Sequence, residues 1–70
     1  MTVQAILFNK KEYTPKSSLM WLHAHRYDPL KIHETKNYYR YRLKEPIKNH
    51  KYITISYGKN IKAVIDISRN

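Results

Sequence analysis

The sequence predicts a single small α+β domain spanning residues 1–70, in which one helix packs on the apolar face of a mainly antiparallel sheet. Three observations predict it. A chain of 70 residues can form one thin core and no second one. Its hydrophobic content of 41% is above that of a disordered chain. One helical segment is followed by repeated alternation of apolar and polar residues, so the expected order of elements is β-α-β-β-β-β.

The first two expected elements are a strand over residues 3–8 and a helix over residues 15–26. The strand is apolar, and polar residues 9–11 end it. The helix has a suitable start, because Thr14 is a good N-cap residue and Pro15 fits the first helical position. The helix should end before Pro29, since a residue that precedes proline avoids helical angles. Its broad apolar stripe is expected to follow Leu19, Leu22 and Arg26, with Met20, Trp21 and His23 nearby. His23 should lie at the edge of the stripe, and His25 should cap the C-terminus of the helix.

Four strands are expected after the helix, over residues 30–34, 38–44, 52–57 and 61–68. Polar or proline-containing turns separate them. Gly58 stands in the last turn, at a position that can require a positive φ. Residues 61–65 could also form a short helix, so the last element remains open between strand and helix.

Alternation along the last three strands assigns their side chains to two faces of the sheet. One face is apolar and should pack on the helix; it carries Tyr39, Tyr41, Leu43, Ile53, Ile55, Tyr57, Ile61, Ala63, Ile65 and Ile67. The opposite face is basic and contains tyrosines; it carries Tyr38, Arg40, Arg42, Lys44, Tyr52, Thr54, Ser56, Lys62 and Val64.

The charge of the chain points to a polyanionic partner. Fourteen lysines and arginines face five acids, which gives a formal net charge of +9. The composition is also rich in Lys, Asn, Ile and Tyr, as an AT-rich coding sequence would produce. Whether the charge reflects function or codon bias therefore stays open at this stage.

A basic sheet face with interleaved tyrosines can neutralise phosphates and stack on unpaired bases. Arg40 and Arg42 should project to the same side, about 7 Å apart along their strand. We therefore predict a non-catalytic nucleic-acid interface with little base specificity, formed by Tyr38, Arg40, Arg42, Lys44, Lys48, Lys51, Tyr52, Lys59 and Lys62. DNA and RNA, and duplex and single strand, remain equally open. The alternative is a small structural or interaction protein that forms a homodimer or docks on an acidic protein partner.

Other function classes find little support in the sequence. No pair of acids is placed for acid–base catalysis, and Ser17 and Ser18 fit helix capping, so no enzymatic activity is expected. No cofactor and no metal are expected, because cysteine is absent and His23 and His25 diverge on the helix. No apolar run is long enough to span a membrane, and residues 1–8 lack the basic start of a signal peptide. We therefore expect an intracellular protein, of the host cell or a virion, that is not secreted.

Several motifs give the chain a resemblance to a known group of proteins. They are the Trp21-Leu22 pair before His25, the run 35–42 with Asn37 before an Arg-x-Arg strand, and the segment 61–65. Across residues 13–65 the chain resembles a small basic domain of uncharacterised proteins from large DNA viruses and of tailed-phage, prohead-associated proteins. Those relatives tend to have glycine before the last segment, where this chain has Asn60. The resemblance implies a viral source and adds virion assembly to the alternatives.

Overall fold

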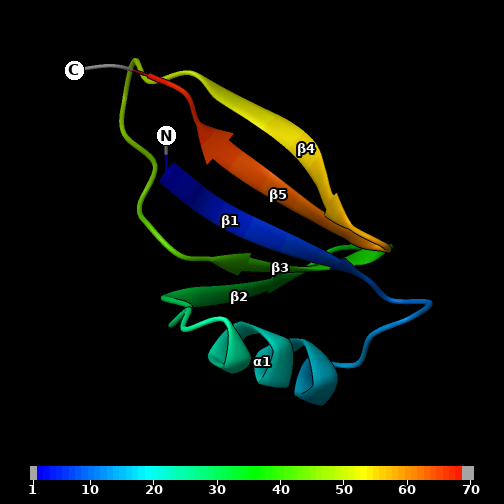
Figure 1. Cartoon of the computed structure of the whole chain (residues 1–70). Helices are drawn as coiled ribbons and strands as arrows, with labels where there is room; N and C mark the ends of the chain where they lie inside the picture. Colours follow the sequence, from blue (N-terminus) through cyan, green and yellow to red (C-terminus); the bar gives the residue numbers. More distant parts are fainter. Residues whose placement is uncertain (1, 69–70) are drawn as a thin grey trace.

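The computed structural model describes residues 2–68, and in this range one helix lies against one face of a sheet (Figure 1). The elements in order are β1 (Thr2–Asn9), α1 (Pro15–Ala24), β2 (Lys31–Glu34), β3 (Tyr38–Arg42), β4 (Tyr52–Gly58) and β5 (Ile61–Asp66). The predicted α+β class and the β-α-β-β-β-β order are confirmed. The last element is a strand, which resolves the alternative of a short helix.

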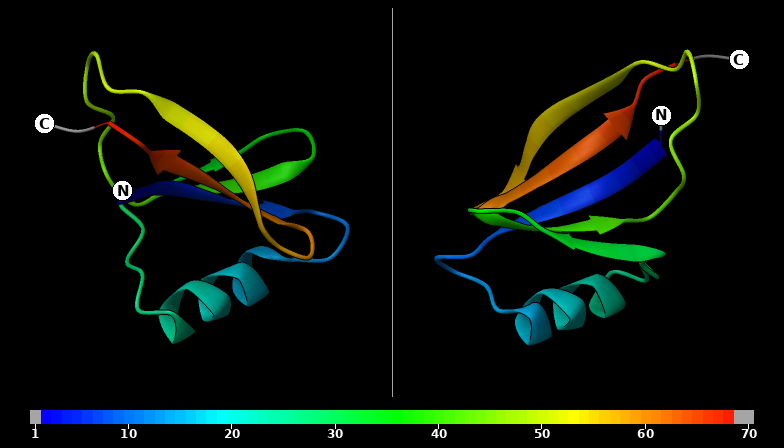
Figure 2. Two further views of the ribbon diagram at one scale, coloured as in Figure 1. Left: turned by 45° about the horizontal axis from the view of Figure 1, so that its top comes forward. Right: turned by 180° about the vertical axis from the view of Figure 1, so that it is seen from behind.

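The sheet places the first strand of the chain at its centre. Over residues 2–68 the strand order is β2-β3-β1-β5-β4, and every neighbouring pair is antiparallel. Two hairpins, β2–β3 and β4–β5, thus flank β1, and β2 and β4 form the two edges. α1 lies on one side of this sheet only, as the views from two further directions show (Figure 2).

The core forms where the helix meets the three middle strands. Its fully or nearly fully buried members are Ile6, Phe8, Leu22, Tyr41 and Ile61. The register places these strand residues on one face, because Ile6 pairs with Tyr41 on one side and with Ala63 on the other. Phe8 lies at the centre of an aromatic cluster, with edge-to-face ring contacts to Tyr13 at 5.0 Å and to Trp21 and Tyr41 at 5.5 Å each.

The helix begins as predicted. The Thr14 side chain accepts the backbone N–H of Ser17, and the Ser17 hydroxyl in turn accepts the N–H of Thr14, so the two residues form a capping box. The expected apolar stripe was partly wrong. Met20 points to solvent and is 63% exposed, whereas Ser18 is fully buried beside Leu22. Ser18 therefore occupies a core position, although hydrophobicity predicts that position for an apolar residue such as Met20.

The helix also ends earlier than predicted, at Ala24 rather than at residue 26. His25 is its C-cap, and the His25 Nδ1 lies 2.8 Å from the carbonyl oxygen of Trp21. Arg26 then adopts a φ of 63°, which lies outside the helical region and breaks the repeat before Pro29 is reached.

Two further expectations are corrected at strand ends. β3 stops at Arg42, because the N–H groups of both Leu43 and Lys44 donate to the Gln4 carbonyl and leave the regular ladder. Gly58 does not adopt a positive φ; Asn60 does so instead, at 62°. Asparagine tolerates this left-handed conformation, so the turn needs no glycine there.

A buried hydroxyl pair fastens the helix to the sheet and predicts unequal effects of two small substitutions. Ser18 Oγ donates to the Thr14 carbonyl at 2.8 Å, which leaves its oxygen to accept the Tyr41 hydroxyl. In Tyr41→Phe, Ser18 keeps its backbone partner, and we expect a loss of about 1 kcal/mol in unfolding free energy. In Ser18→Ala, the buried Tyr41 hydroxyl keeps only a 3.4 Å contact to the Pro15 carbonyl, and we expect about 1–3 kcal/mol. Urea unfolding of both variants measures the two losses of unfolding free energy. Equal losses in the two variants would contradict the prediction.

Candidate nucleic-acid interface

The face of the sheet opposite to α1 gathers the basic side chains of three strands. We call it the basic face, and it consists of Lys31, His33, Tyr38, Arg40, Arg42 and Lys62. The register that places Ile6 and Tyr41 toward the helix turns their sequence neighbours away from it. The sequence assignment of Tyr38, Arg40, Arg42 and Lys62 to one face thus agrees with the observed pairing.

Basic side chains stand directly opposite one another on the two strands at one side of this face. Lys31 pairs with Arg42, and His33 pairs with Arg40, so that cross-strand Cβ atoms lie about 5 Å apart. The four side chains line a shallow hollow of about 220 Å³. Like charges in directly opposite positions destabilise a sheet. An anion that bridges Lys31 and Arg42 would remove the repulsion between these two side chains.

In the middle of the basic face, the central strand β1 contributes only apolar side chains. β1 contributes Ala5 and Leu7, which lie between β3 and β5 in the register. Lys62 stands beyond Leu7, roughly 10 Å from Arg40 across two strand spacings. Its Nζ lies 5.2 Å from the centre of the Tyr38 ring, a cation–π contact that directs this lysine back across β1. Cationic groups thus lie on both sides of β1, whose Leu7 is partly exposed and whose Ala5 is fully buried.

Acidic groups compensate the basic face only weakly. Among residues 2–68, Glu45 forms the ion pair that reaches it, with 3.4 Å between its Oε2 and the Arg42 Nη1. Both side chains of that pair are open to solvent, where such a pair adds little stability. Glu34 lies on the helix side instead and pairs with Lys10 at 2.6 Å. Arg40, Lys31 and Lys62 make no ion pair within the described part of the chain.

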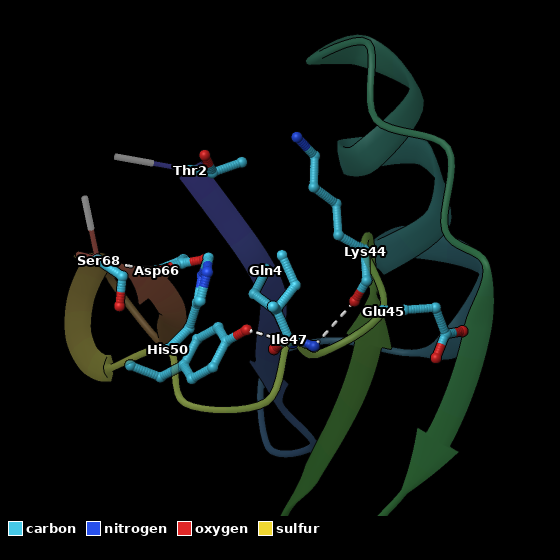
Figure 3. Close-up of a pocket in the computed structure, with 9 residues that line it drawn as sticks. Thr2, Gln4, Lys44, Glu45, Ile47, His50, Asp66 and Ser68 are labelled. Atoms are coloured by element: carbon cyan, nitrogen blue, oxygen red, sulfur yellow. Dashed lines mark hydrogen bonds and ion pairs between the residues drawn. The ribbon is translucent and has the colours of Figure 1, made fainter. Parts of the chain in front are cut away.

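A second cluster lies at one end of the sheet, where the loop of residues 43–51 returns along the ends of β1 and β5. His50 Nδ1 lies 2.6 Å from Asp66 Oδ2, and the Ser68 N–H donates to Asp66 Oδ1 at 2.9 Å (Figure 3). The Ile47 N–H donates to the Tyr52 hydroxyl at 2.7 Å. These bonds hold the loop in place. Side chains of the loop and of the adjoining ends of β1, β4 and β5 line a hollow of about 220 Å³.

The His50–Asp66 pair predicts a loss of stability in acid. The hydrogen bond with His50 and the N–H of Ser68 lower the pKa of the Asp66 carboxyl below its usual value. A carboxyl with a lowered pKa in the folded state stabilises the fold above the pKa of the unfolded chain, and this is lost as the pH falls through the folded-state pKa. We therefore expect wild type to lose more unfolding free energy below about pH 4 than Asp66→Asn does. Chemical unfolding at several pH values measures it, with Asp28→Asn, an exposed acid, as the control; equal pH dependence in wild type and Asp66→Asn would contradict the assignment.

The nine residues predicted from the sequence fall into three places. Tyr38, Arg40, Arg42 and Lys62 lie together on the basic face. Lys44, Lys48, Lys51 and Tyr52 belong to the loop end of the sheet, where the Tyr52 hydroxyl is already occupied by the Ile47 N–H. Lys59 lies in the β4–β5 turn beside Glu12 and Tyr13, apart from the other eight.

Sequence reasoning missed the contribution of β2. Lys31 and His33 alternate within the segment 30–34, and this alternation was the available signal. The alternation alone did not show which face of the sheet these two side chains occupy, because all four residues of the strand are exposed. The face follows only from the pairing of β2 with β3. Lys11 and Lys36 were missed as well; they lie around Tyr38 at the end of the β2–β3 hairpin.

In the described range, no group of three or more His, Asp or Glu side chains is placed to hold a metal ion. No helix of residues 2–68 has the length and apolar character needed to cross a membrane. Compared with known proteins, the chain matches no family model, no curated protein and no solved structure.

Proposed function

We propose that this chain is a non-catalytic nucleic-acid-binding protein that neutralises backbone phosphates with its basic face. One observation carries the proposal: the cations Lys31 and Arg42 occupy directly opposite positions on β2 and β3, at the expense of sheet stability, and Arg40 lies on the same face beside them. Basic residues scattered over the surface by codon bias alone have no reason to be placed this way. A bound polyanion gives that placement a function.

The shape of the basic face favours contacts to phosphates over the reading of bases. Arg40 and Arg42 are two residues apart on one strand, about 7 Å, and a strand presents them in a line. Between β3 and β5, the accessible β1 side chain on this face is that of Leu7, which can form no hydrogen bonds, because Ala5 is fully buried. Tyr38 already contacts Lys62, so base stacking on this ring would have to displace that lysine. We infer low base specificity.

A salt series tests the proposal directly. Fluorescence anisotropy would be measured for labelled duplex DNA, single-stranded DNA and RNA, at about 50 and 200 mM salt. If six or more phosphates are neutralised, the affinity should fall roughly 10³-fold between these two salt concentrations. A preference among the three ligands then separates stacking on unpaired bases from contact with a duplex. Weak binding to all three at the lower salt would overturn the proposal.

The same titration separates nucleic acid from an acidic protein partner. An acidic surface could also meet the basic face, and its binding would weaken with salt too. A poly-glutamate chain in place of nucleic acid provides the comparison. If it binds as tightly as the nucleic acids at both salt concentrations, the face recognises negative charge in general, and the docking alternative replaces the proposal.

A further inference from the structure

β4 is an edge strand without a charged residue in a chain of net charge +9. Its sequence is Tyr-Ile-Thr-Ile-Ser-Tyr-Gly, and it lies at the outside of the sheet in the described range (Figure 1). Edge strands usually carry charge, proline or a cover, because a free edge pairs readily with another strand. β4 carries a bulge near its end, between Ser56 and Gly58, and its remaining length is regular. Most of this edge is therefore open to pairing.

The side of β4 that faces the helix layer is apolar and uncovered. Ile53, Ile55 and Tyr57 are 44%, 39% and 41% exposed. We call these three residues the β4 strip. The register places Ile53 beside Ile65 and Ile55 beside Ala63, so the strip continues the core face of the sheet beyond the helix. At the margin of the strip, the ring centre of Trp21 on the helix lies 5.9 Å from that of Tyr57.

The backbone of β4 also offers hydrogen-bonding groups along its free edge. The Ile67 N–H donates to the Lys51 carbonyl, which makes this register position a hydrogen-bonded pair. In an antiparallel ladder such pairs alternate, so Ile53 and Ile55 bond to β5. The N–H and C=O groups of Thr54 and Ser56 then point outward, away from β5.

The other edge of the sheet provides a contrast within the same molecule. β2 has only four residues and carries Lys31, His33 and Glu34. Ile32 is 52% exposed there, so an apolar side chain is available on that edge too. Its short length and charges are the features that protect an edge from pairing. β4 is longer and lacks such charges.

We propose that β4 pairs with β4 of a second copy of this chain, antiparallel and about a two-fold axis, to form one continuous sheet. A second copy is the occupant that β4 itself fits: the strand carries no charged residue, so two antiparallel copies can pair without placing like charges opposite each other. The repulsion between two chains of net charge +9 comes from the rest of their surfaces. Under a two-fold axis the strip of one copy continues into the strip of the other, since antiparallel pairing keeps like faces on the same side. The pairing leaves both basic faces open, so it is independent of the proposed function.

The first test is the oligomeric state as a function of concentration and salt. Sedimentation velocity of wild type should show a monomer–dimer equilibrium that shifts toward dimer as salt screens the repulsion between copies. This response is opposite to that of nucleic-acid binding, which salt weakens. A protein that stays monomeric at every concentration and salt would overturn the pairing and leave the nucleic-acid proposal standing.

Two variants and one matched control locate the interface. Thr54→Pro removes an outward N–H while the bonds to β5 remain, and Ile53→Lys places a charge within the strip. Both should abolish the dimer, whereas Ile32→Lys, the same change on the other edge, should leave it intact. Circular dichroism confirms that each variant is folded. A dimer that survives both β4 changes, or that is lost only with Ile32→Lys, would overturn the proposal.

Hydrogen exchange provides a readout that needs no variant. The outward amides of Thr54 and Ser56 should exchange quickly in dilute samples and become protected as the concentration rises. Exchange at these two amides that does not change across the dimer transition would place the interface elsewhere and overturn the proposal.

Discussion

Replacing Arg40 and Arg42 together by glutamine is expected to lower the dependence of nucleic-acid affinity on salt by about two phosphate contacts. For duplex DNA, the slope of log affinity against log salt should become less steep by roughly 1.8, since each neutralised phosphate contributes about 0.9. If the two proteins bind equally at 1 M salt, this slope change corresponds to an affinity loss of roughly 60-fold at about 0.1 M. The loss should be similar for unrelated sequences, because the two side chains contact the backbone rather than the bases.

The same double variant should be at least as stable as wild type. Arg42 stands directly opposite Lys31, and removing its charge relieves a repulsion of the order of 0.2–1 kcal/mol between these two side chains. The lost pair with Glu45 is exposed and offsets little of this gain. Affinity and unfolding free energy would therefore move in opposite directions, as expected where a binding surface is kept at a cost in stability.

A charge-matched control shows whether position or net charge matters. Lys16→Ala with Arg26→Gly removes the same two charges from the helix side, and glycine suits the positive φ of Arg26. This control should change the salt slope far less than the Arg40/Arg42 variant does. Equal changes in the two double variants would mean that the protein acts as a diffuse cation, and that the basic face is not the binding site.

The register of the sheet explains how much of the fold could be predicted from the sequence. Alternation over residues 38–43 and 52–65 separates apolar from basic positions, and a shift by one residue would bury the arginines. The observed pairs Ile6–Tyr41 and Ile55–Ala63 follow this division. The strand order does not follow from any local pattern. The first strand enters between the two hairpins, and that placement depends on contacts far apart in the sequence.

The candidate site was harder to predict for the same reason. Lys31 and His33 join the basic face through pairing with β3, which no short-range signal reveals. Lys59 was assigned to the site by its charge, yet its turn lies beside Glu12 and Tyr13. The role of Ser18 was missed because a buried serine depends on one distant partner, the hydroxyl of Tyr41. Residues on regular strands could be assigned to a face, whereas residues in turns and on the short edge strand could not.

Phe8→Ala is expected to have the largest effect on stability of any single substitution discussed. The Phe8 ring is fully buried and contacts three other aromatic rings, those of Tyr13, Trp21 and Tyr41. Truncating a buried phenylalanine costs about 3–5 kcal/mol, because the fold loses the transfer free energy and gains a cavity. A domain of this size has a total stability of only about 4–10 kcal/mol. The variant should therefore lose roughly half of the free energy of unfolding of the domain.

Equilibrium urea unfolding, followed by circular dichroism and by the fluorescence of Trp21, measures this loss. Phe8→Leu should retain more stability, since leucine refills most of the volume while losing the edge-to-face contacts. Met20→Ala is the control, because its side chain is 63% exposed and its removal should stay within about 0.5 kcal/mol. A small loss in Phe8→Ala would mean that the helix does not pack on β1 as described. Such a result would also mean that α1 does not support β1. β1 lies between Arg40 on β3 and Lys62 on β5, so the spacing of these two side chains across the basic face depends on it.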